Sequence, residues 1–240
     1  MAQEGTFAGG FFGYLLAIDT CGPSGSVALG RLAGRDLEIL GQTELEGRSY
    51  SATLVSAIGQ ILAGAGVALG DLGGIVAVNG PGSFTGVRVG LSAVKGLAES
   101  PRIPVAPLSR LLVLSRKSGV PSCALDAHRG EVFLRLEEAG KPSRELLAGK
   151  QELAAIQPPL RVAVCDDQAA ELLAAAWPST QVVLCAAPTA ADALRPGEAR
   201  LVAGGDVDLA LLDGNYLRRS DAEIFGAQLS GAAVSRNKQP

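Results

Sequence analysis

The chain has 240 residues and a net charge of −3, and 48% of its residues are apolar while 19% are charged. This balance excludes a disordered or fibrous polymer and provides enough apolar surface for one large or two small domains. Lysine and arginine are scattered along the chain, so no basic block predicts a protein that holds nucleic acid strongly by itself.

The histidines, cysteines and apolar segments exclude further classes of protein. One histidine and four widely separated cysteines exclude zinc sites built on several imidazoles or on C-x-x-C pairs. The first apolar stretch has no preceding Lys or Arg and is interrupted by Asp19, which is untypical of a signal peptide. No segment approaches the roughly 18 apolar residues of a membrane span. We therefore expect a cytoplasmic protein that does not contact membranes.

Short apolar runs bounded by turn residues predict the strands of the first half. Residues 1–13 are Gly-rich and show no period, which predicts a flexible extension. The runs that follow predict strands at 14–19, 26–30, 36–45 and 74–78.

Two amphipathic helices are predicted in the same half, over 50–65 and 85–99. The apolar stripe of the first contains Leu54, Ile58, Ile61 and Leu62, and that of the second contains Val87, Leu91, Val94 and Leu97. Small residues give the second helix a smooth surface, on which this chain's own sheet or another chain's helix could pack. For the second case we expect a docking face made by Leu54, Ile58, Ile61, Arg88, Leu91, Ala93 and Val94.

The second half repeats the pattern of the first. Asp19 ends the first strand of one half and Asp126 ends the first strand of the other, and each half reads strand–Asp–turn–strand–strand–helix–strand–helix. This duplication predicts an α/β protein of the actin-like ATPase type, with two similar lobes that each hold a mixed sheet flanked by helices. The predicted lobes span 14–106 and 107–225, and 226–240 is predicted to be a disordered tail.

The densest motif is the turn NGPGSFTG at 79–86, before the second helix. Gly80 and Gly82 permit close backbone approach, and Ser83 or Thr85 can cap the helix. The exposed N–H groups of such a helix start could hold an anion, or the turn could simply be a satisfied cap. Its spacing matches neither the dinucleotide-binding nor the P-loop pattern.

The loops after the two aspartates are candidate phosphate turns. We expect Asp19 and Thr20 in the first, and Asp126 and Arg129 in the second, to lie near the phosphate if one binds. Alternatively, each aspartate caps its own turn. No Lys or Arg occurs within 20–25, although many phosphate-cleaving proteins of this fold place a basic residue there.

Four blocks of sequence resemble the TsaB (YeaZ) family of tRNA threonylcarbamoyladenosine biosynthesis. They are LLAIDTCGPSGSVAL, VAVNGPGSFTGVRVGLSAVKGLA, LDAHRGEVF and NYLRRSDAE, in that order, and they cover the chain from about 14 to 225. The resemblance implies an actin-like fold and a non-catalytic role beside TsaD, the paralogue that transfers the threonylcarbamoyl group. TsaD holds its metal through a His-x-x-x-His pair, whereas the corresponding helix here, RSYSATLVSAIG, contains no histidine.

The resemblance also implies partners. The two first-half helices are expected to dock on TsaD, with the ATPase subunit TsaE in the same assembly, tRNA contacted only through the complex, and a homodimer when the chain is alone. No catalytic residue, metal or required cofactor is expected, although the fold is compatible with weak nucleotide binding. The alternative is an ATPase or kinase of the same fold that acts on its own.

Overall fold

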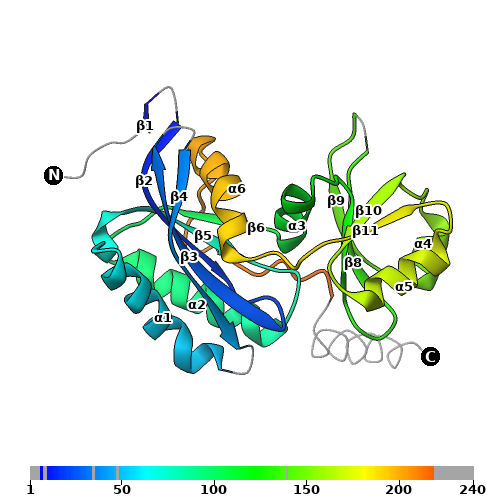
Figure 1. The fold of residues 1–240 in the computed structure, drawn as a ribbon, viewed down its shortest axis with the longest axis horizontal. Helices are drawn as coiled ribbons and strands as arrows, with labels where there is room; N and C mark the ends of the chain where they lie inside the picture. The colour runs from blue at the N-terminus through cyan, green and yellow to red at the C-terminus, as the bar shows by residue number, and fades with distance from the viewer. Residues whose placement is uncertain (1–5, 8–9, 34–35, 47–48, 139, 219–240) are drawn as a thin grey trace, which may run out of the picture.

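A computed structural model describes residues 6–7, 10–33, 36–46, 49–138 and 140–218. The chain forms two α/β lobes, each with a mixed sheet flanked by helices (Figure 1). This arrangement confirms the predicted actin-like fold class.

The first lobe is built on a sheet in the order β4-β3-β2-β5-β6, with β1 paired to β2. Its strands are β1 (Thr6–Phe7), β2 (Gly10–Asp19), β3 (Ser24–Ala33), β4 (Asp36–Glu46), β5 (Leu72–Val78) and β6 (Val105–Leu108). The hairpin-connected strands β2, β3 and β4 are antiparallel, whereas β5 and β6 run parallel to β2. Parallel neighbours need crossover connections, and helices supply them here.

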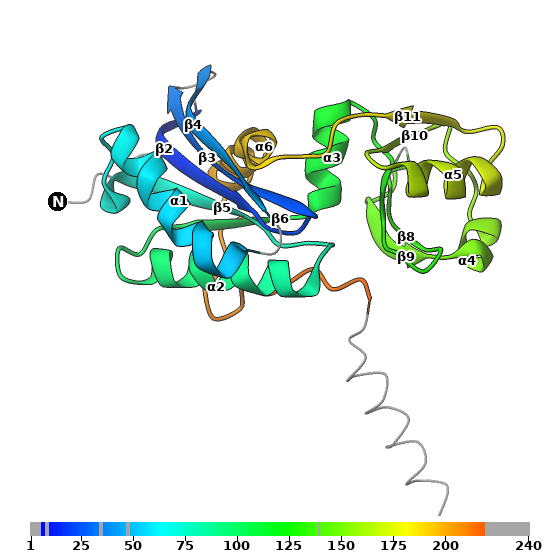
Figure 2. The ribbon, with the colours of Figure 1, turned by 60° about the horizontal axis from the view of Figure 1, so that its bottom comes forward.

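Helices cover both faces of this first sheet. On one face lie α1 (Tyr50–Gly64) and α2 (Phe84–Glu99), with a short 3₁₀ turn at Leu69–Asp71 after α1. On the other face lies α6 (Ala190–Val202), as Figure 2 shows. The apolar stripes of α1 and α2 join the buried strand residues in one core. Both predicted helices of the first half are therefore confirmed within one residue at each end.

The second sheet repeats the connectivity of the first, in the order β9-β8-β7-β10-β11. Its strands are β7 (Cys123–Asp126), β8 (Val132–Leu136), β9 (Arg144–Ala148), β10 (Arg161–Val164) and β11 (Gln181–Leu184). Again the first three strands are antiparallel, and β10 and β11 run parallel to β7. The helices α4 (Lys150–Ala155) and α5 (Asp167–Ala176) supply the crossovers, so the two halves share one topology.

Two helices join the lobes and change the division expected from chain order. The helix α3 (Arg110–Ser118) follows β6 but packs on the second sheet, against β7, β8 and β10. Conversely, α6 follows β11 but packs on β2, β3, β5 and β6. The residues 107–225 therefore return to the first lobe through α6, and α3 and α6 contact one another between the lobes.

The first strand starts earlier than predicted. Residues 1–13 were expected to form an extension, but the strand β2 begins at Gly10, where Phe12 pairs with Ala33 of β3. The Gly-rich sequence before Tyr14 has little strand propensity of its own. It is extended because its backbone pairs with the long strand β3. The predicted tail at 226–240 lies outside the described residues.

Two searches of the described residues bear on the class of protein. No helix in them is long and apolar enough to cross a bilayer. Nor do they contain a group of three or more His, Cys, Asp or Glu residues arranged to hold a metal ion.

Candidate functional site

The turn after β2 lies directly against the start of α2. Thr20 Oγ1 donates to the carbonyl oxygen of Gly86 at 2.7 Å, and the N–H of Ser83 donates to the carbonyl oxygen of Cys21 at 2.8 Å. A Cβ at Gly86 would stand 2.0 Å from the carbonyl oxygen of Thr20, so glycine is required for this approach. The Ser83 hydroxyl caps α2 by accepting from the N–H of Gly86 at 3.2 Å. The glycine motif therefore joins two turns of one lobe.

The carboxylate of Asp19 is fully engaged inside the protein. Its Oδ2 accepts from Nε of Arg110 at 3.2 Å, and its Oδ1 accepts from the N–H of Cys21 at 2.8 Å. Both side chains of the ion pair are buried, 8% exposed for Arg110 and 2% for Asp19. A Cβ at Gly22 would stand 2.4 Å from Nη2 of Arg110, so the guanidinium also lies against the first candidate phosphate turn. We conclude that an internal cation neutralises Asp19.

The anion-binding residues predicted in the first lobe make contacts within the protein. Asp19 and Thr20 make the contacts given above. The carbonyl oxygen of Gly80 accepts from the N–H of Arg110 at 2.7 Å, and a Cβ at Gly82 would lie 2.2 Å from the carbonyl oxygen of Cys21. These contacts favour the satisfied-turn alternative. Ser83 caps its helix as expected, and Thr85 is exposed at the first turn of α2.

The second candidate phosphate turn is a capped turn as well. Asp126 Oδ1 accepts from the N–H of His128 at 2.8 Å, and Asp126 Oδ2 lies 2.6 Å from Nδ1 of the same histidine. His128 and Arg129 both adopt positive φ, near 60°, and both side chains are exposed. Asp126 thus stabilises its own turn, and Arg129 extends from that turn.

Tyr50 and Cys21 lie close to the buried ion pair of Asp19 and Arg110. The Tyr50 hydroxyl donates to the carbonyl oxygen of Gly22 at 2.9 Å, and burial together with the nearby charge of Asp19 raises the pKa of Tyr50 to about 12. Burial, and again the charge of Asp19, raises the pKa of the Cys21 thiol well above its usual value. Both groups are therefore held neutral.

This arrangement predicts a loss of stability in alkali. A raised pKa in the folded state stabilises the fold fully below the unfolded value of 10.0, and the contribution is lost as the pH rises through about 12. We expect the free energy of unfolding, measured by urea titration, to fall across this range. The fall should be shallower in Tyr50→Phe, and the thiols of Cys21, Cys123 and Cys165, whose pKa values burial also raises, contribute to the remainder. A fall in Tyr50→Phe equal to that of the parent protein would contradict the assignment.

The structure corrects the predicted docking residues on α1 and α2. Leu54, Ile58, Leu91 and Val94 are buried in the core of the first lobe, between 0% and 6% exposed. These four side chains pack into the core of their own lobe and leave little surface for a partner, so the structure argues against their assignment to an interface. Ile61 and Ala93 are partly buried against the same core, and Arg88 is exposed. The apolar stripe of each helix faces its own sheet, as amphipathic helices generally do.

The opposite side of the two helices forms a solvent-exposed surface of small residues. We call it the outer face; it consists of Ala52, Val55, Ser56, Gly59 and Ala63 of α1 with Gly96 of α2. Val55 is 62% exposed, and a Cβ added at Gly59 or Gly96 would meet nothing within 4 Å. Nothing in the described part of the lobe requires glycine at these two positions.

Gly59 should therefore reduce the stability of the isolated chain. Glycine inside a helix costs backbone entropy, so Gly59→Ala is expected to raise the free energy of unfolding by about 0.5–1 kcal/mol. Gly119→Ala is the matched control, because Gly119 also has open space around it but adopts a φ of 65°. The same methyl group should destabilise there. Destabilisation by Gly59→Ala in urea unfolding would contradict the exposed placement.

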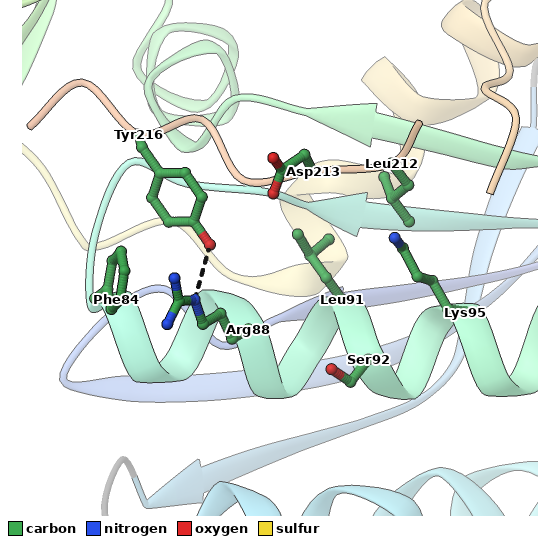
Figure 3. Close-up of a pocket in the computed structure, with 8 residues that line it drawn as sticks. All are labelled: Phe84, Arg88, Leu91, Ser92, Lys95, Leu212, Asp213 and Tyr216. Carbon is green, nitrogen blue, oxygen red and sulfur yellow. Dashed lines mark hydrogen bonds between the residues drawn. The ribbon is translucent and has the colours of Figure 1, made fainter. Parts of the chain in front are cut away.

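A cleft of about 410 Å³ lies on the other flank of α2, between that helix and the segment 212–216. Figure 3 shows its lining side chains, including Phe84, Arg88 and Lys95 of α2 and Asp213 and Tyr216 of the segment. The guanidinium of Arg88 stacks 3.7 Å from the ring centroid of Phe84, and its Nε donates to the hydroxyl of Tyr216 at 3.4 Å. Phe84 and Tyr216 were not among the predicted site residues, although both lie in blocks that carry the family resemblance.

Sequence comparisons find similarity to proteins of tRNA threonylcarbamoyladenosine biosynthesis. The family model described as TsaD, tRNA N6-adenosine threonylcarbamoyltransferase, matches residues 42–151. The protein named "tRNA threonylcarbamoyladenosine biosynthesis protein TsaB" is 34% identical in Escherichia coli, over 50% of this chain and 52% of that protein. Its namesake in Bacillus subtilis is 35% identical, over 51% of this chain and 54% of that protein. The chain thus matches about half the length of these curated relatives.

Solved structures extend the fold similarity to most of the chain. A Pseudomonas aeruginosa protein described as similar to the peptidase YEAZ covers 86% of this chain and all of its own, with a TM-score of 0.71 and 24% identity. A structure described as YeaZ from the same organism gives a TM-score of 0.67 with the same coverage and identity. The shared architecture therefore includes both lobes.

Proposed function

We propose that this chain, which is similar to TsaB (YeaZ) proteins over about half of their length, is a non-catalytic subunit that binds and supports a TsaD-type enzyme in forming threonylcarbamoyladenosine on tRNA. One observation carries the non-catalytic part: the buried ion pair between Asp19 and Arg110. In this pair the carboxylate at the end of the first strand binds an internal guanidinium. The same carboxylate would otherwise be placed to meet a nucleotide-bound cation between the lobes.

The proposal gives the outer face of α1 and α2 to TsaD. Small residues allow the backbone of a partner helix to approach closely, and Val55 supplies an exposed apolar contact on this face. Two exposed helix glycines that no internal contact requires are better explained by a surface that is covered in the assembly. We propose that TsaE and tRNA join through this complex, and that a homodimer through the same face competes with it when TsaD is absent.

The alternative is an ATPase or kinase that acts alone, which the two-lobed fold alone would allow. The contacts of Arg110 argue against it, because this side chain lies against the first turn and pairs with the Asp19 carboxylate at its start. In our proposal the chain needs no cofactor and makes or breaks no bond.

Sedimentation of the chain with TsaD from the same organism tests the proposal, with binding of ATP and magnesium to the chain alone as the second measurement. We expect a stable complex with TsaD and no ATP hydrolysis by the chain alone. Failure to form the complex, together with saturable ATP binding and hydrolysis by the chain, would replace the partner role by the ATPase alternative.

A further inference from the structure

We propose that the cleft between α2 and the segment 212–216 binds a single strand of RNA, with phosphates at Arg88 and Lys95 and a base against Tyr216. The inference deepens the proposed function, on which it rests for the choice of RNA as the nucleic acid. It assigns an RNA contact to this chain itself.

The cleft combines the two chemical features that single-stranded nucleic acids require. Arg88 and Lys95 lie seven residues apart on one side of α2, two helical turns or about 10 Å along its axis. Neither forms an ion pair with any described residue, so both charges remain available for phosphates. Two cations spaced in this way can follow a phosphate backbone.

The aromatic rings complete the site. Phe84 is 39% exposed and Tyr216 is 36% exposed, with their ring centroids 5.1 Å apart. Arg88 lies over the ring of Phe84 and 5.9 Å from the centroid of Tyr216, which orients the guanidinium at the cleft wall (Figure 3). An aromatic ring beside a cation is the arrangement on which unpaired bases stack. An acidic peptide would use the cations but has no base to stack on the rings.

Asp213 is the single carboxylate among the cleft-lining residues. Its Oδ1 accepts from the N–H of Gly214 at 2.7 Å, which ties the carboxylate to its own turn. A carboxylate repels phosphate but accepts hydrogen bonds from base amino groups and ribose hydroxyls. Asp213 therefore places the phosphates at the two cations and the base or sugar between them.

The test is fluorescence anisotropy of a labelled single-stranded RNA of about ten nucleotides with the full chain, at salt concentrations from about 50 mM to about 200 mM. Arg88→Ala and Lys95→Ala should each lower the slope of log affinity against log salt by about 0.7. Tyr216→Leu should weaken binding by roughly five-fold or more and leave the slope unchanged. Lys141→Ala, which removes an exposed cation of the second lobe, is the matched control and should change neither quantity.

Three outcomes would overturn the proposal: absence of RNA binding at the lowest salt, unchanged slopes in both cation variants, or an equal loss in Lys141→Ala. Sedimentation with TsaD separates this proposal from the partner role. Cation variants that lose TsaD while RNA binding is unchanged would assign the cleft to an acidic protein surface instead. Loss of RNA binding with an intact TsaD complex in Arg88→Ala and Lys95→Ala supports the RNA site.

Discussion

Arg110→Ala is expected to lower the free energy of unfolding by about 3–5 kcal/mol, because it leaves the buried carboxylate of Asp19 without its cation. The loss extends beyond one ion pair. Arg110 lies on α3, which packs on the second sheet, and Asp19 ends a central strand of the first sheet. The variant therefore also removes a link between the lobes. Chemical unfolding followed by circular dichroism measures the change.

Two control variants separate the ion pair from a general effect of losing an arginine. Arg31 pairs with Glu38 on the surface, both more than half exposed, so Arg31→Ala should cost less than about 1 kcal/mol. The double variant Asp19→Asn with Arg110→Met removes the buried charges together and should recover much of the stability that Arg110→Ala loses. An Arg110→Ala protein within about 1 kcal/mol of the parent would contradict the structural role of this pair.

Gly59→Arg is expected to weaken the complex with TsaD by about 2–4 kcal/mol, roughly thirty-fold to a thousand-fold, while the isolated chain stays folded. A long charged side chain at the centre of a closely packed helix interface holds the two backbones apart and is desolvated without a partner. In the isolated chain the same side chain extends into solvent, since nothing lies within 4 Å of a Cβ at Gly59. Sedimentation equilibrium of variant and partner measures the affinity.

The controls for Gly59→Arg use the same chemistry elsewhere. Ala174→Arg places the same side chain on the exposed side of α5 in the second lobe and should leave the affinity unchanged. Gly59→Ala distinguishes a steric effect from a change in helix stability. If Gly59→Arg binds TsaD as tightly as the parent, the outer face is not the docking surface.

The sequence predicts the helices and strands better than it predicts what their side chains pack against. Hydrophobic period predicts α1 and α2 correctly, but it does not reveal whether an apolar stripe faces its own sheet or a partner. Leu54 and Leu91 were assigned to the partner for this reason, and the structure buries both. The neighbouring small residues, which the same pattern leaves in solvent, form the outer face.

Contacts between residues far apart in sequence could not be predicted. Arg110 and Asp19 are 91 positions apart, and α3 is a helix of nine residues, too short for a strong periodic signal. Likewise, Tyr216 lies 128 positions from Arg88, and nothing local indicates that the two side chains meet. The return of α6 to the first sheet has the same cause, because chain order alone assigns a helix to the lobe that precedes it.

The most direct test of the central claim is threonylcarbamoyl transfer to tRNA by the TsaD of the same organism, supplied with its other components, with and without this chain. The account predicts that omission abolishes or strongly lowers transfer, that adding the chain restores it, and that the chain alone transfers nothing. Undiminished transfer without the chain would contradict the partner role.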